Sequence, residues 1–493
     1  MTYEKPRPPH RRKFLHGIAI GGAAFVLNGL WGPPRALGQN PPNCPPAPVN
    51  GTPFVPGQDT RPIVQRTSIS ALSSSQINQL RLAFARLRAL PSTDNRTRIL
   101  QADMHAMYCQ ACNNGTVQSV HRSWNFFPWH RAFLYYFERI LGSLVGNLNY
   151  FRLPYWDWEN QRSLPSAYWS PASSSNSLYD VSRYAPINSG GALPTNDGTG
   201  ARISLLNGIT DFATFGGTAT KGGACENNPH DPIHDDVGLH TSPWHDMGHL
   251  GYAARDPIFY SHHCNIDKIW SRWNALAASS SSPAYRNPTD PAFLSERWNF
   301  YDENQQVVSI SAADVLNHQT NLRFSYPAPT TTQASSLSAQ ASPANAVSSP
   351  APMGNAPAVS VYAVRLIHSG PSSDPALDAT YNVKTTVIQA VSQQNSSIAV
   401  VLRGVTVPED ATGVFDILSA RGSRKKHLGT VAVVADSMRM GTLVETVVLD
   451  ATDAVEDLFD SSSPARLTLV PREGNRSFIL RTQDAELRVI SRR

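Results

Sequence analysis

The sequence predicts a protein of two domains, a mainly α-helical domain over residues 39–326 and an all-β domain over residues 358–493. Three observations support this division. Before residue 275, apolar residues recur in several segments at spacings of three and four, as on a buried helix face. Residues 327–357 are rich in Pro, Ala, Ser and Thr and carry no charge, which is typical of a linker. Beyond that linker, short apolar runs separated by Gly, Pro or Asp are typical of strands.

Residues 1–38 predict an export signal. The run His10–Leu15, H-R-R-K-F-L, resembles a twin-arginine signal, and it precedes a weakly apolar region and the small-residue exit Ala36–Gly38. That pathway carries folded proteins, often with a cofactor already loaded, so we expect a bacterial protein that is periplasmic or secreted and holds a metal. The alternative is a basic, apolar terminus with no export role. No other segment of the sequence is long and apolar enough to span a bilayer.

The charge balance gives no reason to expect nucleic acid as a partner. The formal net charge is +5, but the basic excess lies in the first 40 residues. The remainder is near neutral, whereas a nucleic-acid-binding surface needs a basic patch or stripe.

The helical domain begins with a Pro-rich, extended segment over residues 39–67, and two helices follow. The first helix, capped by Ser74 or Ser75, is predicted by four apolar positions at helical spacing: Ile77, Leu80, Phe84 and Leu87. The second covers Arg96–Tyr108 and carries His105.

The most aromatic window of the sequence runs from His121 to Arg139 and predicts a helix that carries His130. Pro128 suits its first turn, where an N–H would be unpaired in any case, and an apolar stripe follows at Phe133, Leu134 and Phe137. This places an imidazole at the mouth of a buried face. Taken alone, such a histidine is also compatible with a core residue hydrogen-bonded to the backbone.

The segment between this helix and the next histidines is less regular. Pro154–Trp158 is a short aromatic segment, and the Ser-, Gly- and Asn-rich stretch to about Gly223 predicts long surface loops. Ordered signals resume at His230–His234 and at a helix that begins at Asp256.

The C-terminal domain is predicted to be a β-sandwich. Its expected strands are Val359–Ile367, Val383–Val391, Ile398–Val407, Val431–Ala435, Leu443–Leu449, Leu467–Val470 and Phe478–Leu480. The domain holds two histidines and no metal-ligand spacing, so we assign the chemistry to the first domain.

Histidines cluster in the helical domain, where ten of the fifteen fall between His105 and His263. His230 and His234 are four residues apart, so on a helix they project from one face and can share a metal ion. Alone this spacing is a weak signal, because it also occurs in zinc and structural sites.

Helix periodicity separates the neighbouring histidines His262 and His263. Residues spaced by four and three place His263 on the buried face together with Phe259, Ile266, Trp270 and Trp273. We therefore assign His263 as a ligand. His262 is turned about 100° away and is expected to support the ligands or pack against them.

The histidines thus form two sets of three: His105, His121 and His130, then His230, His234 and His263. Six nitrogen ligands without an obvious carboxylate or thiolate argue against magnesium, calcium and carboxylate-bridged di-iron, and favour copper or zinc. Two metals with three imidazoles each leave open positions for a small bridging ligand. Copper, unlike zinc, can pass electrons to it.

These motifs resemble those of type-3 dicopper proteins, the tyrosinases, catechol oxidases and hemocyanins, and are most similar to plant polyphenol oxidases. The matching segments are H-A-M-Y-C at His105–Cys109, V-H-R-S-W-N-F-F-P-W-H-R at Val120–Arg131, E-N-N-P-H-D-P-I-H at Glu226–His234 and R-D-P-I-F-Y-S-H-H-C-N-I-D-K-I-W at Arg255–Trp270. Weaker likeness continues at Phe300–Asn304 and Gly413–Leu418. The resemblance implies a four-helix bundle that holds two copper ions, with O2 as co-substrate and small phenols as substrates.

The reaction implied by this resemblance is oxidation of phenols to o-quinones, with or without prior ortho-hydroxylation. Glu226 matches the glutamate that orients a water as base in this family, although a surface glutamate in a loop is the alternative. Asp231 follows His230 where many tyrosinases have Asn, and it could hold the same water. Monophenol hydroxylation therefore stays open.

The resemblance also suggests which residues form the substrate pocket. Leu250, thirteen residues before His263, stands where plant enzymes often carry a bulky Phe gate, and it predicts freer substrate entry. Phe126, Phe127 and Asn265 are expected to line the pocket, with plain core packing as the alternative for the two phenylalanines.

The five cysteines are an odd number for an exported protein, and the family offers an explanation. Cys109 matches the cysteine joined by a thioether to the second ligand, here His121. Cys44 and Cys112 match a disulfide of the plant enzymes. Cys225 and Cys264 could pair or stay reduced, because their separation cannot be inferred from sequence.

By analogy with the family, the C-terminal domain is expected to cover the copper site as a lid until it is removed, with residues 327–357 as the site of cleavage. Two other functions stay open. One is an oxygen carrier of the hemocyanin kind without turnover, and the other is a structural or binding protein without copper. The oligomeric state cannot be predicted.

Overall fold

The computed structural model describes residues 46–109, 119–194, 200–238, 246–279, 284–328, 358–363, 365–367, 376–378, 396–407, 413–421, 424–433, 443–454, 465–471, 482 and 484–491. All of these residues belong to one compact unit of the chain, residues 37–493. The predicted export signal lies outside the described residues, and so does nearly all of the predicted linker.

The first two helices are α1 (Ser74–Arg88) and α2 (Arg98–Tyr108). The cap of α1 is Ser73, not Ser74 or Ser75 as predicted, because its hydroxyl accepts the N–H of Gln76 while the Gln76 side chain accepts the N–H of Ser73. Helix α2 begins two residues later than predicted, since Thr97 caps it by accepting the N–H of Leu100.

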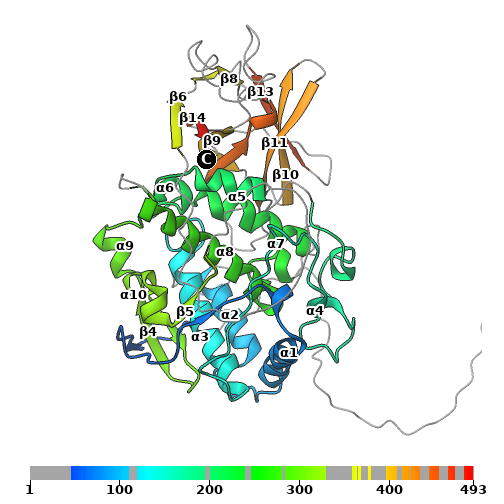
Figure 1. Cartoon of the computed structure of the whole chain (residues 1–493), viewed down its shortest axis with the longest axis vertical. Helices are drawn as coiled ribbons and strands as arrows, with labels where there is room; N and C mark the ends of the chain where they lie inside the picture. The colour runs from blue at the N-terminus through cyan, green and yellow to red at the C-terminus, as the bar shows by residue number, and fades with distance from the viewer. Residues whose placement is uncertain are drawn as a thin grey trace, which may run out of the picture. The chain divides into compact units, whose positions relative to one another are not determined.

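The centre of the helical domain is formed by α3 (Phe126–Leu144) and α8 (Ile258–Ala275), and α3 packs against both α8 and α1 (Figure 1). The contact between α3 and α8 is aromatic: the rings of Phe137 and Tyr260 stack with centroids 3.7 Å apart. The apolar stripe predicted on α3 is buried throughout, so it faces this core.

Buried charges beneath the core are paired between these helices. Arg131 of α3 donates to Asp267 of α8 at 2.7 Å, and its guanidinium lies over the Trp270 ring. Arg66 donates to Glu138 of α3 at 2.9 Å. Because a buried charge without a partner is strongly destabilising, these pairs restrict how α3 and α8 can pack.

The stretch predicted as long surface loops instead contains short helices with buried side chains. The short helices are α4 (Ser166–Trp169), η2 (Ile187–Ser189), α5 (Gly200–Asn207) and α6 (Phe212–Phe215). The prediction was wrong because isolated large apolar residues anchor the polar stretch. Phe215, for example, stacks on Trp273 of α8 with ring centroids 4.5 Å apart.

The second histidine segment is a π-helical turn, η3 (Glu226–His230), that continues into α7 (Asp231–Val237). His230 lies at the junction, and its ring centroid is 4.5 Å from that of His234. The prediction that these two histidines share one helix face is therefore confirmed. The turns η4 (Asp246–Gly248) and η5 (Ala253–Arg255) lead into α8, which begins two residues after Asp256.

The helical domain is closed by pairing of its two ends. The short strand β1 (Thr52–Pro53) runs parallel to β4 (Val307–Ser311), which is antiparallel to β3 (Arg297–Tyr301). Likewise β2 (Val64–Gln65) pairs in parallel with β5 (Phe324–Ser325). The remaining short helices are η1 (Ile69–Ala71), η6 (Leu276–Ser279), α9 (Pro291–Ser295), α10 (Ala312–Leu316) and α11 (His318–Leu322).

The C-terminal domain contains two sheets whose internal pairings are antiparallel. One has the order β11-β10-β13-β8-β7 and the other β12-β9-β14-β6. The strands are β6 (Ala358–Ala363), β7 (Arg365–Ile367), β8 (Ala376–Asp378), β9 (Ser396–Val407), β10 (Gly413–Arg421), β11 (Arg424–Val433), β12 (Leu443–Asp450), β13 (Ala465–Pro471) and β14 (Asp484–Ser491), with η7 (Thr452–Ala454) between β12 and β13. The strands predicted at 383–391 and 478–480 lie outside the described residues.

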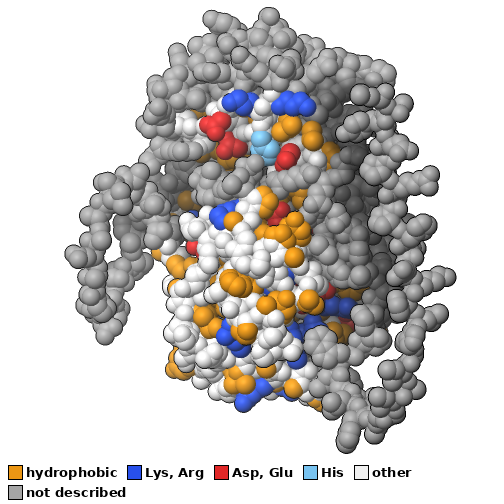
Figure 2. All heavy atoms as spheres, turned by 90° about the vertical axis from the view of Figure 1, so that its right-hand side faces the viewer, with side chains coloured by type: hydrophobic (Ala, Val, Ile, Leu, Met, Phe, Trp, Pro, Cys, Tyr) orange, Lys and Arg blue, Asp and Glu red, His pale blue; other side chains and the backbone are white. Residues whose placement is uncertain are grey.

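The described surface is mixed in charge. On the face shown in Figure 2, basic and acidic side chains are interspersed with apolar ones. Within the described ranges, no helix combines the length and the apolar character needed to cross a membrane.

Candidate metal centre

The first histidine group consists of His105, His121 and His130, whose ligand nitrogens all lie within 4.8 Å of one another. His105 projects from α2 and His130 from the first turns of α3, while His121 lies in the loop before α3. All three are buried. The structure therefore brings together the first predicted set of three ligands.

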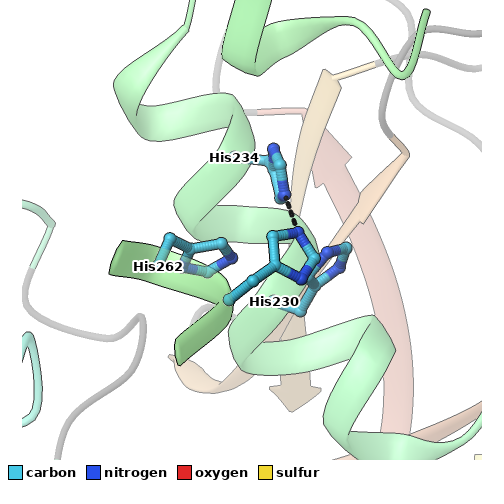
Figure 3. Close-up of side chains that lie close together, drawn as sticks. His230, His234 and His262 are labelled. Carbon is cyan, nitrogen blue, oxygen red and sulfur yellow. Dashed lines mark hydrogen bonds between the residues drawn. The ribbon is translucent and has the colours of Figure 1, made fainter. Parts of the chain in front are cut away.

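The second group consists of His230, His234, His262 and His263, with nitrogens again within 4.8 Å of one another. The first two come from the η3–α7 junction and α7, and the last two from α8. Figure 3 shows the rings of His230, His234 and His262 around a common space. His262 thus lies against the other histidines, as expected of a residue that supports the ligands or packs against them, although it is as deeply buried as His263.

The two groups adjoin. The rings of His130 and His263 stack with centroids 4.2 Å apart and an interplanar angle of 8°. The ring of His121 lies 5.9 Å from that of His230. Seven imidazoles from four helical segments and one loop therefore converge on one buried volume.

Backbone carbonyl oxygens fix the orientation of three of these rings, and the carboxylate of Asp231 fixes that of His230. Nδ1 of His105 lies 3.1 Å from the Leu250 carbonyl oxygen, and Nδ1 of His130 lies 2.7 Å from that of Phe126. Nδ1 of His234 lies 2.9 Å from the Met247 carbonyl oxygen. When Nδ1–H donates to such an acceptor, Nε2 keeps its lone pair for a metal.

Several ring nitrogens of these histidines have no hydrogen-bond partner among the described residues. They are Nε2 of His130 and His230, both ring nitrogens of His121 and His262, and Nδ1 of His263. In addition, Nε2 of His234 faces Nε2 of His263 at 3.2 Å. Buried polar atoms without partners are costly, and a bound cation is the ordinary way to satisfy bare imidazole nitrogens.

Burial keeps these histidines neutral. It lowers the pKa of His130 to about 3 and that of His234 to about 4, and it lowers the pKa of the other five well below their usual value. Neutral imidazole is the form that binds a metal. An all-imidazole donor set suits copper or zinc and not magnesium or calcium, so the residues present fit a pair of copper ions.

Arg122 connects the two groups. It follows His121, has a left-handed backbone conformation with φ 57°, and its N–H donates to both carboxylate oxygens of Glu226, at 2.9 and 3.1 Å. Its guanidinium contacts Asp231 at 2.6 Å and donates to Asn227 at 2.8 Å. The other oxygen of Asp231 lies 2.7 Å from Nδ1 of His230.

This arrangement settles where Glu226 lies. Its side chain is 1% exposed, so the alternative of a surface glutamate in a loop is wrong. Sequence reasoning did not identify Arg122 as a site residue. Its only signal was its position directly after His121, a predicted ligand.

The predicted pocket residues differ in how close they lie to the histidines. Phe126 contacts both groups, with its ring 4.7 Å from His230 and 4.9 Å from His130. Phe127 instead stacks on Phe215 and Trp270, and in these contacts it is a core residue. Leu250 is buried and adjoins the site through its carbonyl.

Two further buried side chains, Asn265 and Phe259, belong to the surroundings of the histidines. Asn265 is fully buried, and neither amide atom has a hydrogen-bond partner among the described residues. Phe259, identified from sequence only as part of an apolar stripe, lies 4.8 Å from His105 and 4.2 Å from His263 between ring centroids. It excludes water from the space between the groups.

The described cysteines are buried. Sγ of Cys109 lies 3.3 Å from Nε2 of His105, so this thiol is at the first group. Cys225 and Cys264 are not joined to each other in a disulfide. Cys44 and Cys112 lie outside the described residues.

Strands of the C-terminal domain contact the turn that carries His230. The side-chain amide of Asn227 donates to the Thr446 carbonyl of β12, and that of Asn228 donates to the Thr430 carbonyl of β11, each at 3.0 Å. A second contact joins Arg488 of β14 to Asp211 at 3.1 Å.

Comparison with known families and proteins gives consistent matches. Residues 99–204 and 173–276 match the common central domain of tyrosinase, and residues 287–334 match the polyphenol oxidase middle domain. Polyphenol oxidase II of Ipomoea batatas is 34% identical over 346 residues, which is 60% of this chain and 57% of that protein. The latent polyphenol oxidase of Prunus armeniaca is 28% identical over 482 residues, 88% of this chain and 77% of that protein. The chain covers 51% of the length of the Vitis vinifera relative and 54% of the Antirrhinum majus relative, so it spans about half the length of several of these proteins.

Solved structures show the same fold. Latent apple tyrosinase superposes with a TM-score of 0.61 at 23% identity and covers 89% of this chain and 100% of its own. Polyphenol oxidase of Grenache (Vitis vinifera) superposes with a TM-score of 0.51 at 31% identity over 59% of this chain and 92% of its own. With its two histidine groups in this fold, the chain belongs to the type-3 copper family of tyrosinases and polyphenol oxidases.

Proposed function

We propose that this protein oxidises o-diphenols to o-quinones with O2 at a dicopper centre. The observation that carries the proposal is the pair of adjoining, buried imidazole groups, several of whose ring nitrogens have no hydrogen-bond partner among the described residues. The ligands are His105, His121 and His130 for one copper, and His230, His234 and His263 for the other. When bound, a pair of copper ions supplies the one-electron redox chemistry that O2 activation requires.

His263 rather than His262 is proposed as the sixth ligand. Its ring stacks on His130 of the first group, and its Nε2 faces Nε2 of His234 at 3.2 Å. The ring of His262 lies between those of His230 and Trp158, at 5.3 and 6.2 Å. His262 supports the position of His230 in this assignment.

The remaining residues orient ligands and exclude water. Asp231 holds the His230 ring through Nδ1, which directs Nε2 inward. Phe126 and Phe259 contact histidines of both groups and keep the space between them dry. In such a low-dielectric site, electrostatic interactions with the substrate are stronger than in water.

Monophenol hydroxylation needs the phenol proton to be removed, and we assign this role to a water held by Glu226. Burial of Glu226 next to the loop of His121 supports this assignment. Asp231 is committed to His230 and Arg122, which favours a ligand-orienting role over proton transfer. We expect diphenol oxidation to exceed monophenol hydroxylation for this reason.

We propose that substrate enters past Leu250 and that Asn265 lies in its pocket. Leu250 is smaller than the Phe that it would replace as a gate, so bulky diphenols should enter more freely. The amide of Asn265 lacks a partner among the described residues, so it can bond to a substrate hydroxyl.

The C-terminal domain is proposed to be a lid that keeps the enzyme latent. The hydrogen bonds from Asn227 and Asn228 to β12 and β11 support this role, because they lie directly before His230. Relatives of Prunus armeniaca and apple are described as latent forms. Cleavage within residues 327–357 would then expose the site.

We further propose that the chain is a bacterial protein exported by the twin-arginine pathway. In addition, we assign a thioether between Cys109 and His121 and a disulfide between Cys44 and Cys112. Cys109 is buried at the first histidine group, but its Sγ lies nearest to Nε2 of His105, at 3.3 Å, so the thioether to His121 rests on the family motif. Intact mass and peptide mapping of the mature protein test these three assignments together.

The central experiment is O2 uptake by copper-loaded protein with a monophenol and with its o-diphenol, before and after limited proteolysis. We expect quinone formation from the diphenol, at a rate that rises after cleavage. Reversible O2 binding without quinone would instead favour an oxygen carrier. Equal rates before and after cleavage would contradict the lid.

A further inference from the structure

A file of aromatic rings connects the first histidine group with a cavity near the other end of α3. The ring of Trp129 lies 4.9 Å from that of His130 and 5.9 Å from that of His105. Successive centroid distances along the file are 5.7 Å for Trp129 to Phe300, 5.5 Å for Phe300 to Tyr136, and 4.9 Å for Tyr136 to Tyr135. We call Trp129, Phe300, Tyr136 and Tyr135 the aromatic file.

The indole at the inner end of the file has no hydrogen-bond acceptor. Trp129 is fully buried, and its N–H has no hydrogen-bond partner among the described residues. Trp158 shares this property, whereas the equally buried indole N–H groups of Trp156, Trp270 and Trp273 donate to oxygen atoms. Without an acceptor, an oxidised Trp129 keeps its proton, so the missing electron is not trapped there by proton loss.

The outer end of the file has the opposite property. The hydroxyl of Tyr135 donates to the carboxylate of Asp59 at 2.9 Å. Burial raises the pKa of Tyr135 to about 12, so the phenol is protonated at rest. Although burial opposes it, bonding to Arg61 lowers the pKa of Asp59 to about 2, so the carboxylate is ionised and able to accept a proton from an oxidised phenol.

A cavity of about 370 Å³ opens at this end of the file. Tyr135, Tyr136, Asp59 and Arg139 line it, together with Val55, which is 45% exposed and lies at the solvent side. This volume is within the range of small-molecule sites. The cavity is thus a place where a small molecule can contact both tyrosines without entering the metal centre.

We propose that the aromatic file is a path for single electrons, and that the cavity is a second site at which small phenols are oxidised by one electron. The inference rests on the proposed function, because the oxidant is the metal centre after it has reacted with O2. The path would protect the histidine ligands when the centre is oxidised and no diphenol is bound there.

Trp129 would give one electron to the bound metal pair, and it would be refilled through Phe300 and Tyr136 from Tyr135. Tyr135 loses its hydroxyl proton to Asp59 and becomes a neutral radical. A phenol in the cavity gives one electron to Tyr135, Asp59 returns the proton, and the proton of the phenol goes to solvent. One phenol is oxidised to its radical for each electron that the centre gains.

Packing of a hydrophobic core accounts for the ring contacts within the aromatic file. It does not account for the surroundings of the two residues at the ends of the file, Trp129 and Tyr135. A packed core places no requirement on the Trp129 N–H, and satisfying it would be stabilising. Nor does packing require a buried tyrosine to donate to an ionised carboxylate at a cavity. The two ends together match what electron and proton release need.

The test uses the full, copper-loaded chain reduced and then exposed to O2 without a phenol. Rapid freezing and electron paramagnetic resonance should show a tyrosyl radical, assigned by ring-deuterated tyrosine. The bulky one-electron donor ABTS should be oxidised at the same time. Tyr135→Phe should abolish the radical and slow ABTS oxidation by about tenfold or more, while catechol oxidation stays within about twofold of wild type.

Tyr260→Phe is the matched control. Tyr260 is also fully buried and stacks on Phe137 with centroids 3.7 Å apart, but it is not part of the file. It should leave both the radical and ABTS oxidation unchanged. Trp129→Phe with two coppers bound should lose the radical as well.

A radical and an ABTS rate that survive in Tyr135→Phe overturn the inference, and so does an equal loss in Tyr260→Phe. Catechol oxidation without any tyrosyl radical overturns it while the proposed function stands. Absence of copper-dependent O2 uptake with catechol would contradict the proposed function itself and remove the oxidant on which the path depends.

Discussion

The side-chain amide of Asn228 donates a 3.0 Å hydrogen bond to the backbone carbonyl of Thr430, and so ties the turn before His230 to strand β11. Asn227, the preceding residue, makes the equivalent bond to Thr446 of β12. These two amides, both buried, connect the C-terminal domain with the second histidine group.

Replacing Asn227 and Asn228 by Ala should partly activate the intact chain. A net contribution of about 1 kcal/mol for each hydrogen bond predicts a rise of roughly tenfold or more in diphenol oxidation before proteolysis. The rate after proteolysis should change less, since the lid is then absent. The control is Asn188→Ala, because Asn188 bonds to Asp180 and Arg183 within the helical domain. No rise in the uncleaved double variant would count against the lid.

Arg122→Gln should lower kcat more than it raises KM. The substitution leaves the buried carboxylates of Asp231 and Glu226 without their cationic partner, so the His230 ring loses its fixed orientation. We expect a loss of about ten- to hundredfold in kcat, the range found when the partner of a metal ligand is removed.

Arg122→Lys provides the comparison for that variant. It keeps the charge and the backbone N–H to Glu226, but its shorter ammonium lacks the fixed planar geometry of the guanidinium that contacts Asp231 and Asn227. Partial recovery of kcat in Arg122→Lys is expected. Full activity in Arg122→Gln, with two coppers bound, would show that Arg122 does not position the ligands.

Copper content should separate His263 from His262. His263→Ala should bind about one copper per chain and lose diphenol oxidation, because it removes one of three ligands of the second copper. His262→Ala should keep two coppers with weaker binding at the second site. Metal analysis after dialysis measures the copper content of each variant. One copper in His262→Ala and two in His263→Ala would exchange the two assignments.

Acid stability should depend on His318 of α11. Burial and the neighbouring Arg131 lower its pKa from the usual 6.5 to about 3. The unfolded chain therefore binds a proton at this site below pH 6.5 while the folded chain does not. The contribution of the neutral imidazole to the free energy of unfolding is fully present above pH 6.5. It is lost as the pH falls toward 3, by up to about 1.4 kcal/mol per pH unit.

His318→Gln removes that dependence. Denaturant unfolding of copper-loaded wild type and variant between pH 7 and 4 should show that wild type loses stability more steeply on acidification. A constant difference between the two proteins over this range would contradict the assignment of the acid sensitivity to His318.

The sequence alone was sufficient to select the histidines of the two groups and to predict a helical part followed by strands. Periodicity predicted His263 on the buried face of α8, although His262 is buried there as well, and the spacing of His230 and His234 placed both on one helix face. Both are local consequences of helix geometry, which a sequence carries without knowledge of the tertiary fold. The strands Ile398–Val407 and Leu443–Leu449 were likewise predictable from alternation, and they fall within β9 and β12.

Only the tertiary structure decided what surrounds these ligands. The buried helices within the Ser- and Gly-rich stretch and the position of Phe127 in the core depend on contacts with distant segments. The link from Arg122 to Glu226 and Asp231 joins residues more than 100 positions apart. The aromatic file also depends on long-range packing, because Phe300 of β3 lies between Trp129 and Tyr136 of α3. Local spacing therefore selects the candidate ligands, whereas the residues that hold and connect them are set by long-range packing.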